Sequence, residues 1–181
     1  MPDKPIILTG FMGSGKSSVG RELACRLGWR FVDLDAVIEA DAGMSITEIF
    51  ALEGESGFRL RESCALEQAI NAGQVVISGG GGLVISAGNR QLMRSRGIVV
   101  NLNAAPDVIM NRLAGCSNRP LLSGDSAAER INRLMTEREH FYRDADIRID
   151  TDNKSVEDVA LEIVKVLKGL PSFCASCEGA G

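Results

Sequence analysis

Short apolar runs rich in β-branched residues alternate along the chain with longer amphipathic segments. The runs predict strands at 6–9, 31–32, 75–78, 98–102 and 147–149. The amphipathic segments predict helices at about 16–27, 36–41, 46–53, 57–72, 87–95, 106–114, 126–143 and 156–168. Continuous apolar strands that alternate with helices are typical of a parallel sheet with helices on both faces. We therefore predict a three-layer α/β/α fold with a central sheet of five parallel strands.

Some predicted helices begin with the spacing of a capping box. In this motif a serine and an acidic residue three positions later satisfy backbone donors at the start of a helix. The pairs with this spacing are Ser45 and Glu48, Ser126 and Glu129, and Ser155 and Asp158. They indicate where these helices begin independently of the hydrophobic pattern.

Length and composition favour a single domain. The chain has 181 residues, of which 45% are hydrophobic, which is enough for one buried core and too little for two ordinary domains. No apolar stretch is long enough to span a membrane, and the N-terminus does not resemble a signal peptide. A net charge of −4 argues against a broad nucleic-acid surface. We expect a cytoplasmic protein with one domain over 1–170 and no membrane or nucleic-acid partner.

The cysteines do not have the pattern of a disulfide framework. There are five of them, scattered along the chain, and no secretion signal accompanies them. Cys174 and Cys177 form a CxxC pair, but a zinc site needs more ligands and a redox pair normally opens a helix. Because this pair lies among Pro, Ser and Gly residues, we expect residues 171–181 to form a disordered tail.

Residues 10–17 read GFMGSGKS, which is a complete GxxxxGK[ST] motif. The motif lies between a predicted strand and a predicted helix, which argues against a chance glycine-rich turn. In such a loop the backbone N–H groups and the helix N-terminus surround phosphate oxygens. Lys16 then reaches the β- and γ-phosphates, and the Ser17 hydroxyl is suited to bind Mg²⁺. We expect the nucleotide to contact Met12, Gly13, Ser14, Gly15, Lys16, Ser17 and Ser18.

Two aspartates follow the second predicted strand. Asp33 and Asp35 would point the same way on an extended segment, toward the edge of the sheet that holds the phosphate loop. One carboxylate near Mg²⁺ and one that accepts a proton from a substrate hydroxyl would suit phosphoryl transfer. The alternative is that the aspartates cap the next helix, which is plausible for Asp35 in particular.

Four consecutive glycines at 79–82 follow the third predicted strand. Glycines at a strand end lack a side chain that would keep a ligand away from the main chain. We therefore expect a ligand to approach the backbone closely at this position.

A long polar loop at 114–125 interrupts the regular alternation between two predicted helices. Loops of this length in compact domains usually serve a function. A mobile cover over the nucleotide would keep water from the γ-phosphate. We expect a lid over about 113–125, and the alternative is a plain exposed connection.

The motifs together resemble those of the shikimate kinases, a family of P-loop small-molecule kinases. The matching segments, in family order, are GFMGSGKSSVG at 10–20, FVDLD at 31–35, GFRLRE at 57–62, GGGLV at 80–84, NRPLL at 118–122 and ERxxFY at 137–142. The resemblance implies that the γ-phosphoryl group of ATP is transferred to the 3-hydroxyl of shikimate in aromatic amino-acid biosynthesis. It also implies Mg²⁺ as the cofactor, ATP and shikimate as the small-molecule partners, and a monomer as the working form.

On the nucleotide side, the resemblance makes Lys16 the phosphate-binding lysine and Ser17 the Mg²⁺ ligand, with Asp33 reaching the ion through water. Arg119 matches a lid arginine that closes on the ATP phosphates, and Arg112 matches a residue near the adenine. Lys16 and Arg119 are therefore expected to act in catalysis.

On the acceptor side, the resemblance makes Asp35 the carboxylate that holds the shikimate hydroxyls and takes the proton from the attacking one. Arg59 and Arg138 match the pair that grips the shikimate carboxylate, and Glu62 matches an acid that orients them. The expected substrate-binding segment spans about 34–61. The glycine run is expected to contact the ring through Gly80, Gly81 and Gly82. A planar carboxylate independently calls for the bidentate fork of arginine.

Three other functions would use the same phosphate loop. A GTPase would need NKxD and DxxG motifs, but Asn153 and Lys154 are not followed by the required Asp and DxxG is absent from the sequence. A kinase for gluconate or a nucleoside monophosphate would lack the set of Asp35, Arg59 and Arg138. A binding module that has lost catalysis is disfavoured by the intact motif residues.

Overall fold

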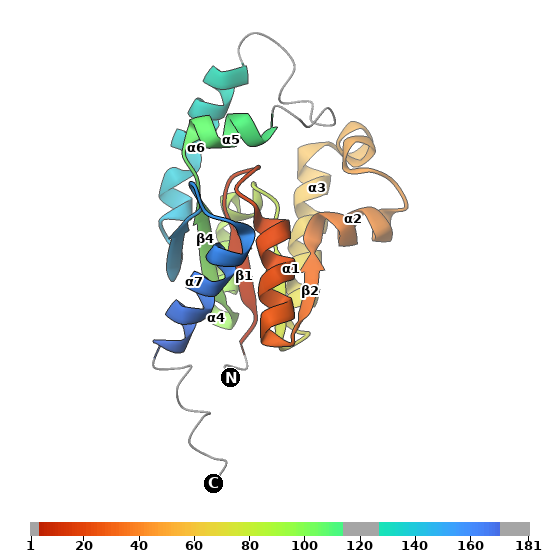
Figure 1. Cartoon of the computed structure of the whole chain (residues 1–181). Coiled ribbons are helices and arrows are strands. Elements are labelled where there is room, and N and C mark those ends of the chain that lie inside the picture. The colour runs from red at the N-terminus through yellow and green to blue at the C-terminus, as the bar shows by residue number, and fades with distance from the viewer. Residues whose placement is uncertain (1–3, 114–126, 171–181) are drawn as a thin grey trace.

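The computed structural model of the protein describes residues 4–113 and 127–170 (Figure 1). The strands are β1 (Ile6–Thr9), β2 (Arg30–Asp33), β3 (Val75–Ser78), β4 (Ile98–Asn103) and β5 (Ile147–Asp150). The helices are α1 (Lys16–Leu27), α2 (Leu34–Ala42), α3 (Ile46–Ile70), α4 (Ala87–Arg96), α5 (Pro106–Leu113), α6 (Ala127–Tyr142) and α7 (Val156–Lys168). A short 3-10 helix, η1 (Leu83–Ile85), follows the glycine run and was not predicted.

The strands form one five-stranded parallel sheet, as the sequence predicted. Their order, for which the sequence analysis made no prediction, is β2-β3-β1-β4-β5. The central strand β1 pairs with β3 on one side and with β4 on the other. The chain therefore crosses from one half of the sheet to the other beside β1. In open α/β sheets, ligands bind at the carboxyl ends of the strands where the strand order reverses in this way.

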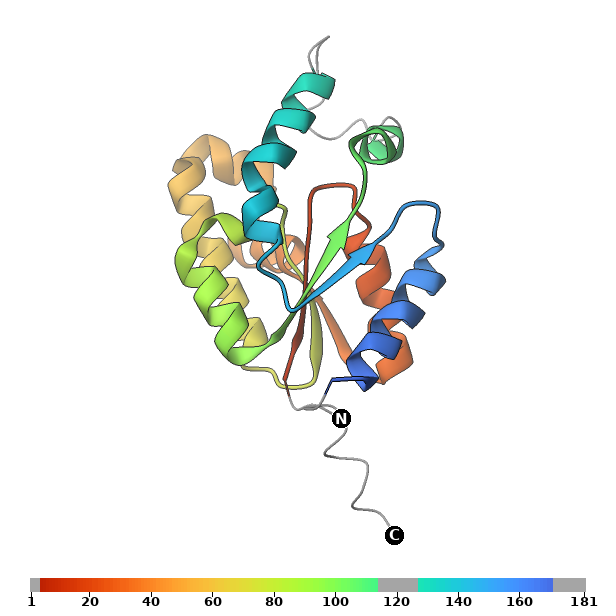
Figure 2. The same ribbon diagram turned by 90° about the vertical axis from the view of Figure 1, so that its left-hand side faces the viewer.

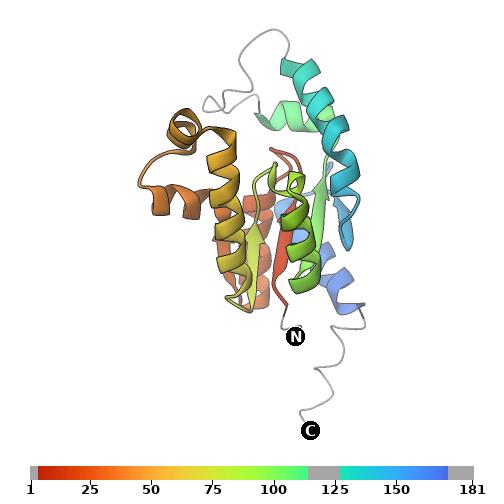
Figure 3. The same cartoon turned by 180° about the vertical axis from the view of Figure 1, so that it is seen from behind.

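Helices cover both faces of the sheet, as Figure 2 shows. Alternating side chains of β1 serve the two faces, because Ile6 and Leu8 join one buried cluster and Ile7 joins the other. The cluster that contains Leu8 packs against α1 and α7. The cluster that contains Ile7 packs against α3, α4 and α6, which lie in front of the sheet in Figure 3. None of the helices within the described ranges is both long and apolar enough to cross a membrane.

Between β2 and β3, α2 and the first part of α3 project from the sheet, whereas the second part of α3 packs against it (Figure 1). The predicted helices 46–53 and 57–72 are the two parts of α3, which is interrupted at Gly54 with φ 70° and ψ −175°. Capping boxes are present at Ser45 and at Ser155, while Ser126 lies outside the described residues. The expected lid at 113–125, apart from its first residue, and the expected tail at 171–181 also lie outside them.

Candidate active site

The phosphate loop connects the central strand to α1. Its backbone has positive φ angles at Gly13 (79°) and Gly15 (93°), which glycine adopts at little cost. The Lys16 ammonium group donates a 2.9 Å hydrogen bond to the Phe11 carbonyl across the loop. Lys16 is only 9% exposed, so the loop shields most of its side chain from solvent. The loop thus presents a lysine and a helix N-terminus, which suits a polyphosphate.

A cluster of oxygen ligands lies beside the loop. The Ser17 hydroxyl donates a 2.7 Å hydrogen bond to Asp33 Oδ2 and lies 3.4 Å from the Ser78 hydroxyl oxygen. Within the described residues, no group of three or more His, Cys, Asp or Glu side chains could hold a metal by itself. The hydroxyl and carboxylate oxygens nevertheless fit Mg²⁺, which takes few protein ligands and keeps waters and phosphate oxygens.

The expectation that Asp33 and Asp35 lie on one extended segment is wrong. Asp33 ends β2 and caps α2, because its side chain accepts a 3.2 Å hydrogen bond from the Asp35 backbone N–H. Asp35 lies in the first turn of α2, so the helix begins before the predicted residue 36. The capping residue is therefore Asp33 and not Asp35. Both side chains nevertheless line the same cavity as the phosphate loop.

This cavity has a volume of about 210 Å³. Its lining consists of Met12, Gly13, Gly15, Lys16, Ser17, Ser18, Asp33, Asp35, Ser78, Gly79, Gly80 and Gly81. Ser14 is buried, and Ser14, Gly82, Arg59, Arg112 and Arg138 are not part of the lining. Ser78 was missed as a site residue, although the carboxyl-end rule points to the last residue of β3 as well as of β2. Gly79 was predicted only as part of the glycine run at 79–82 and was given no contact of its own.

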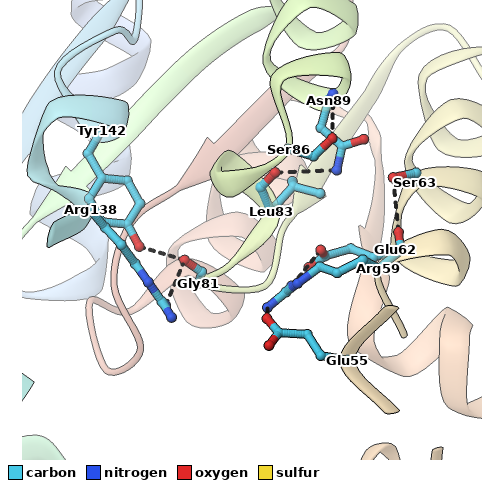
Figure 4. A network of polar contacts seen from close by, with 10 residues as sticks. All are labelled: Glu55, Arg59, Glu62, Ser63, Gly81, Leu83, Ser86, Asn89, Arg138 and Tyr142. Carbon is cyan, nitrogen blue, oxygen red and sulfur yellow. Dashed lines mark hydrogen bonds and ion pairs between the residues drawn. The ribbon is translucent and has the colours of Figure 1, made fainter. Parts of the chain in front are cut away.

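On the side of the glycine run formed by α3, Arg59 and Glu62 form an ion pair (Figure 4). Arg59 Nη1 lies 2.6 Å from Glu62 Oε2, and the Glu62 side chain is fully buried. A Cβ atom at Gly80 would lie 3.0 Å from Glu62 Oε1 and 3.1 Å from Asp35 Oδ1, so this glycine lies between the two carboxyl groups. A Cβ at Gly82 would overlap the Arg59 guanidinium.

The residues around Glu62 shift the pKa of its carboxyl group. Burial raises the pKa of the Glu62 carboxyl above its usual value, and the Arg59 guanidinium opposes the rise. Asp35 adds to the rise in the pKa, whereas Arg138 lowers it. The pKa of the Glu62 carboxyl thus responds to the charges of three neighbouring residues, and such perturbed groups are typical of functional sites.

On the other side of the glycine run, α6 contributes Arg138 and Tyr142 (Figure 4). The Tyr142 hydroxyl donates a 2.6 Å hydrogen bond to the Gly81 carbonyl, which also accepts a 3.3 Å hydrogen bond from Arg138 Nη1. Burial raises the pKa of Tyr142 to about 12, so the phenol remains a donor at physiological pH. The two arginines predicted to bind a carboxylate thus flank one glycine turn.

Arg112 joins the phosphate loop to the segment after β5. Its guanidinium donates hydrogen bonds to the Thr151 hydroxyl at 3.0 Å, to the Thr151 carbonyl at 2.8 Å and to the Gly13 carbonyl at 3.4 Å. Thr151 carried no predicted role. Arg119, predicted to close over the phosphates, lies outside the described residues.

Comparison with known proteins identifies the family. The family model for shikimate kinase matches residues 12–168. The shikimate kinase of Geobacter metallireducens is 54% identical over 164 residues, which cover 91% of this chain and 92% of that protein. The shikimate kinase of Geobacter sulfurreducens is 51% identical over 163 residues, which cover 90% of each chain.

Comparison with solved structures leads to the same family. A shikimate kinase from Acinetobacter baumannii in complex with shikimate superposes with a TM-score of 0.87 at 36% identity, covering 92% of this chain and 93% of that one. A gluconokinase from Sinorhizobium meliloti, with a TM-score of 0.57 at 16% identity, shares the fold alone. These similarities set the GTPase and sister-kinase alternatives aside. The chain belongs to the shikimate kinase family, and it is an ATP-dependent kinase of shikimate.

Proposed function

We propose that the γ-phosphoryl group of MgATP is transferred to the 3-hydroxyl of shikimate in the cavity beside the phosphate loop, and that the residues described below carry out this transfer. The observation that carries this proposal is a single arrangement. Lys16, Ser17 and Asp35 line one cavity, and Arg59 and Arg138 flank the glycine turn at its edge. A site for phosphate and a site for a carboxylate are thus adjacent, and the hydroxyl of an acceptor would lie between them.

The phosphate side uses the loop and α1. The Lys16 ammonium exchanges its bond to the Phe11 carbonyl for oxygens of the β- and γ-phosphates. Met12, Gly13, Ser14, Gly15 and Ser18 complete the nucleotide site through the loop. The proposal assigns Arg112 to the adenine side on the sequence motif, and its guanidinium joins the phosphate loop to Thr151. The role of Arg119 as the lid arginine rests on the sequence motif.

Ser17 and Asp33 hold Mg²⁺ in this proposal. Ser17 supplies a direct oxygen ligand, and Asp33 reaches the ion through water. The ion, when bound, neutralises charge on the phosphate oxygens. The Ser78 hydroxyl lies close enough to Ser17 to orient it.

On the acceptor side, Asp35 holds the attacking hydroxyl and accepts its proton. The transition state of phosphoryl transfer is loose, so the carboxylate acts mainly by positioning the hydroxyl. Arg59 and Arg138 bind the shikimate carboxylate from the two sides of the glycine turn. The backbone of Gly80, Gly81 and Gly82 lies against the ring.

The segment 34–61 then corresponds to the substrate-binding part of a single domain over 1–170. We propose that the protein acts as a monomer, because one chain supplies residues for both substrates. We also propose that it acts in the cytoplasm. The acidic net charge of −4 gives no electrostatic reason for a nucleic-acid partner.

Replacing Arg59 by Lys tests the assignment of the carboxylate site. Lysine keeps the charge but loses the bidentate fork, so we expect the KM for shikimate to rise by about tenfold and the KM for MgATP to stay constant. Arg94→Lys is the matched control, because Arg94 forms an exposed ion pair with Asp144. Equal changes in both KM values for Arg59→Lys would overturn the assignment.

A further inference from the structure

The carbonyl oxygen of Gly81 is a meeting point for two side chains of α6. Tyr142 donates to it at 2.6 Å and Arg138 donates to it at 3.3 Å. These two residues are one helical turn apart, so they lie on the same face of α6. The shorter bond belongs to the residue that is more deeply buried, since Tyr142 is only 5% exposed. The tyrosine therefore fixes the helix, while the longer arginine contact is the easier one to exchange for a ligand.

The segment that carries Gly81 is itself held in place. The Asn89 side chain donates a 3.3 Å hydrogen bond to the Leu83 carbonyl, and Arg90 Nη1 donates a 2.7 Å hydrogen bond to the Val84 carbonyl. The Arg90 guanidinium also lies 4.4 Å from the ring centre of Phe141, which neighbours Tyr142 in the sequence. The glycine turn thus has a defined position relative to α4, so a bond to Gly81 also gives α6 a defined position.

The same turn determines where Arg59 lies. The Arg59 guanidinium packs directly against Gly82, the residue after the glycine whose carbonyl accepts the bond from Tyr142. Arg59 is anchored from behind by Glu62, with 2.6 Å between the ion-paired atoms. The distance from Arg59 to Arg138 therefore depends on two contacts with the glycine turn, that of Arg59 with Gly82 and that of α6 with the Gly81 carbonyl. On the α6 side, the Tyr142 hydroxyl makes the shorter bond.

We propose that Tyr142 is a positioning residue for acceptor binding, because its hydrogen bond to the Gly81 carbonyl sets the spacing between Arg138 and Arg59. The proposal rests on the proposed function, in which both arginines grip the acceptor carboxylate. Tyr142 keeps its proton throughout and touches neither substrate. Loss of the Tyr142 hydroxyl would loosen the Arg138 half of the carboxylate site and leave the phosphate site intact.

Tyr142→Phe tests the proposal, since it removes the hydroxyl and keeps the buried ring. A single hydrogen bond of this kind contributes on the order of 1 kcal/mol, so we expect the KM for shikimate to rise by about fivefold. We expect the KM for MgATP to change less than about twofold on the same scale. A role in stability alone would lower the active fraction and leave both KM values unchanged, and that result would overturn the proposal.

Thr136→Val is the matched control on the same helix. The Thr136 hydroxyl donates a 2.9 Å hydrogen bond to the Asn132 carbonyl within α6, on the exposed side. This variant also removes one hydroxyl-to-carbonyl bond, and we expect neither KM to change. A rise in the shikimate KM of the control equal to that of Tyr142→Phe would contradict a specific role for Tyr142.

A double-mutant cycle with Arg138→Lys separates the two levels of the argument. If Tyr142 acts through Arg138, its replacement will have a smaller effect when Arg138 is already Lys. Additive effects would overturn the proposal while leaving the proposed function intact. If Arg138→Lys itself leaves the shikimate KM unchanged, the assignment of Arg138 fails, and the role of Tyr142 fails with it.

Discussion

The Ser17 hydroxyl donates a 2.7 Å hydrogen bond to Asp33 Oδ2, and this bond joins the first turn of α1 to the last residue of β2. The same aspartate caps α2 through its other oxygen, which accepts from the Asp35 backbone N–H at 3.2 Å. One side chain thus links Ser17, the proposed Mg²⁺ ligand, to the helix that carries Asp35, which we propose holds the attacking hydroxyl.

Asp33→Asn should weaken the use of Mg²⁺ without unfolding the protein. Asparagine caps helices about as well as aspartate, so α2 should keep its start. It lacks the negative charge that attracts the ion through water, and losses of about tenfold are typical for such outer ligands. We expect the Mg²⁺ concentration for half-maximal activity to rise by about tenfold in a titration at saturating ATP and shikimate. An unchanged titration curve would remove Asp33 from the metal site.

Gly82→Ala should act on shikimate and not on ATP. The added Cβ would occupy the space of the Arg59 guanidinium, which lies at the end of a flexible side chain and must move away. We expect the KM for shikimate to rise by about tenfold, since a charged hydrogen bond to the ligand is weakened.

The control for this substitution is Gly88→Ala in α4. A Cβ there would have its nearest neighbour, Ser86 Oγ, at 3.7 Å, which is an ordinary contact. We expect normal kinetics for the control. Normal kinetics for Gly82→Ala as well would show that the position of Arg59 against this glycine does not matter for acceptor binding.

The buried carboxyl of Glu62 predicts a pH dependence. Burial raises its pKa above the ordinary value of 4.5, so it takes up a proton at a higher pH than an exposed glutamate. Protonation weakens its hold on Arg59, and the KM for shikimate should therefore rise as the pH falls toward this pKa. In Glu62→Gln, the part of this rise in the shikimate KM at low pH that is due to Glu62 should disappear, and the part due to protonation of the shikimate carboxylate should remain. The same rise in the shikimate KM at low pH in the wild type and in Glu62→Gln would contradict this reasoning.

The same shift fixes the sign of an effect on stability. A carboxyl whose pKa is raised by folding favours the folded state when it is protonated. The stability of the wild type relative to Glu62→Gln should therefore fall as the pH rises through the folded-state pKa. Denaturant unfolding of both proteins across this range measures the difference, and a relative stability that rises with pH would reverse the assigned shift.

The fold could be predicted from the sequence because its signals are local and strong. The alternation of apolar runs with amphipathic segments predicted each strand of the sheet. It also predicted separate helices at 46–53 and 57–72, which lie on the two sides of the break at Gly54 in α3. The start of α2 was misjudged at Asp35 because apolar periodicity does not reveal which of two nearby aspartates caps the helix.

The site could be predicted only in part for a physical reason. The phosphate loop is one continuous motif, so its residues were found directly. Pairs such as Arg59 with Gly82 or Tyr142 with Gly81 join distant parts of the chain, and one partner in each is a backbone group. A backbone carbonyl has no sequence signature, so the significance of Tyr142 emerged only once α6 lay beside the glycine turn.

The most direct test of the account is the release of ADP from MgATP in the presence and absence of shikimate, by the wild type and by Asp35→Asn. Asp107→Asn is the control, because Asp107 is also an acidic residue in the first turn of a helix. We predict shikimate-dependent ADP release by the wild type and the control, and a loss of at least about 100-fold in Asp35→Asn. ADP release that does not depend on shikimate, or that is unchanged in Asp35→Asn, would contradict the account.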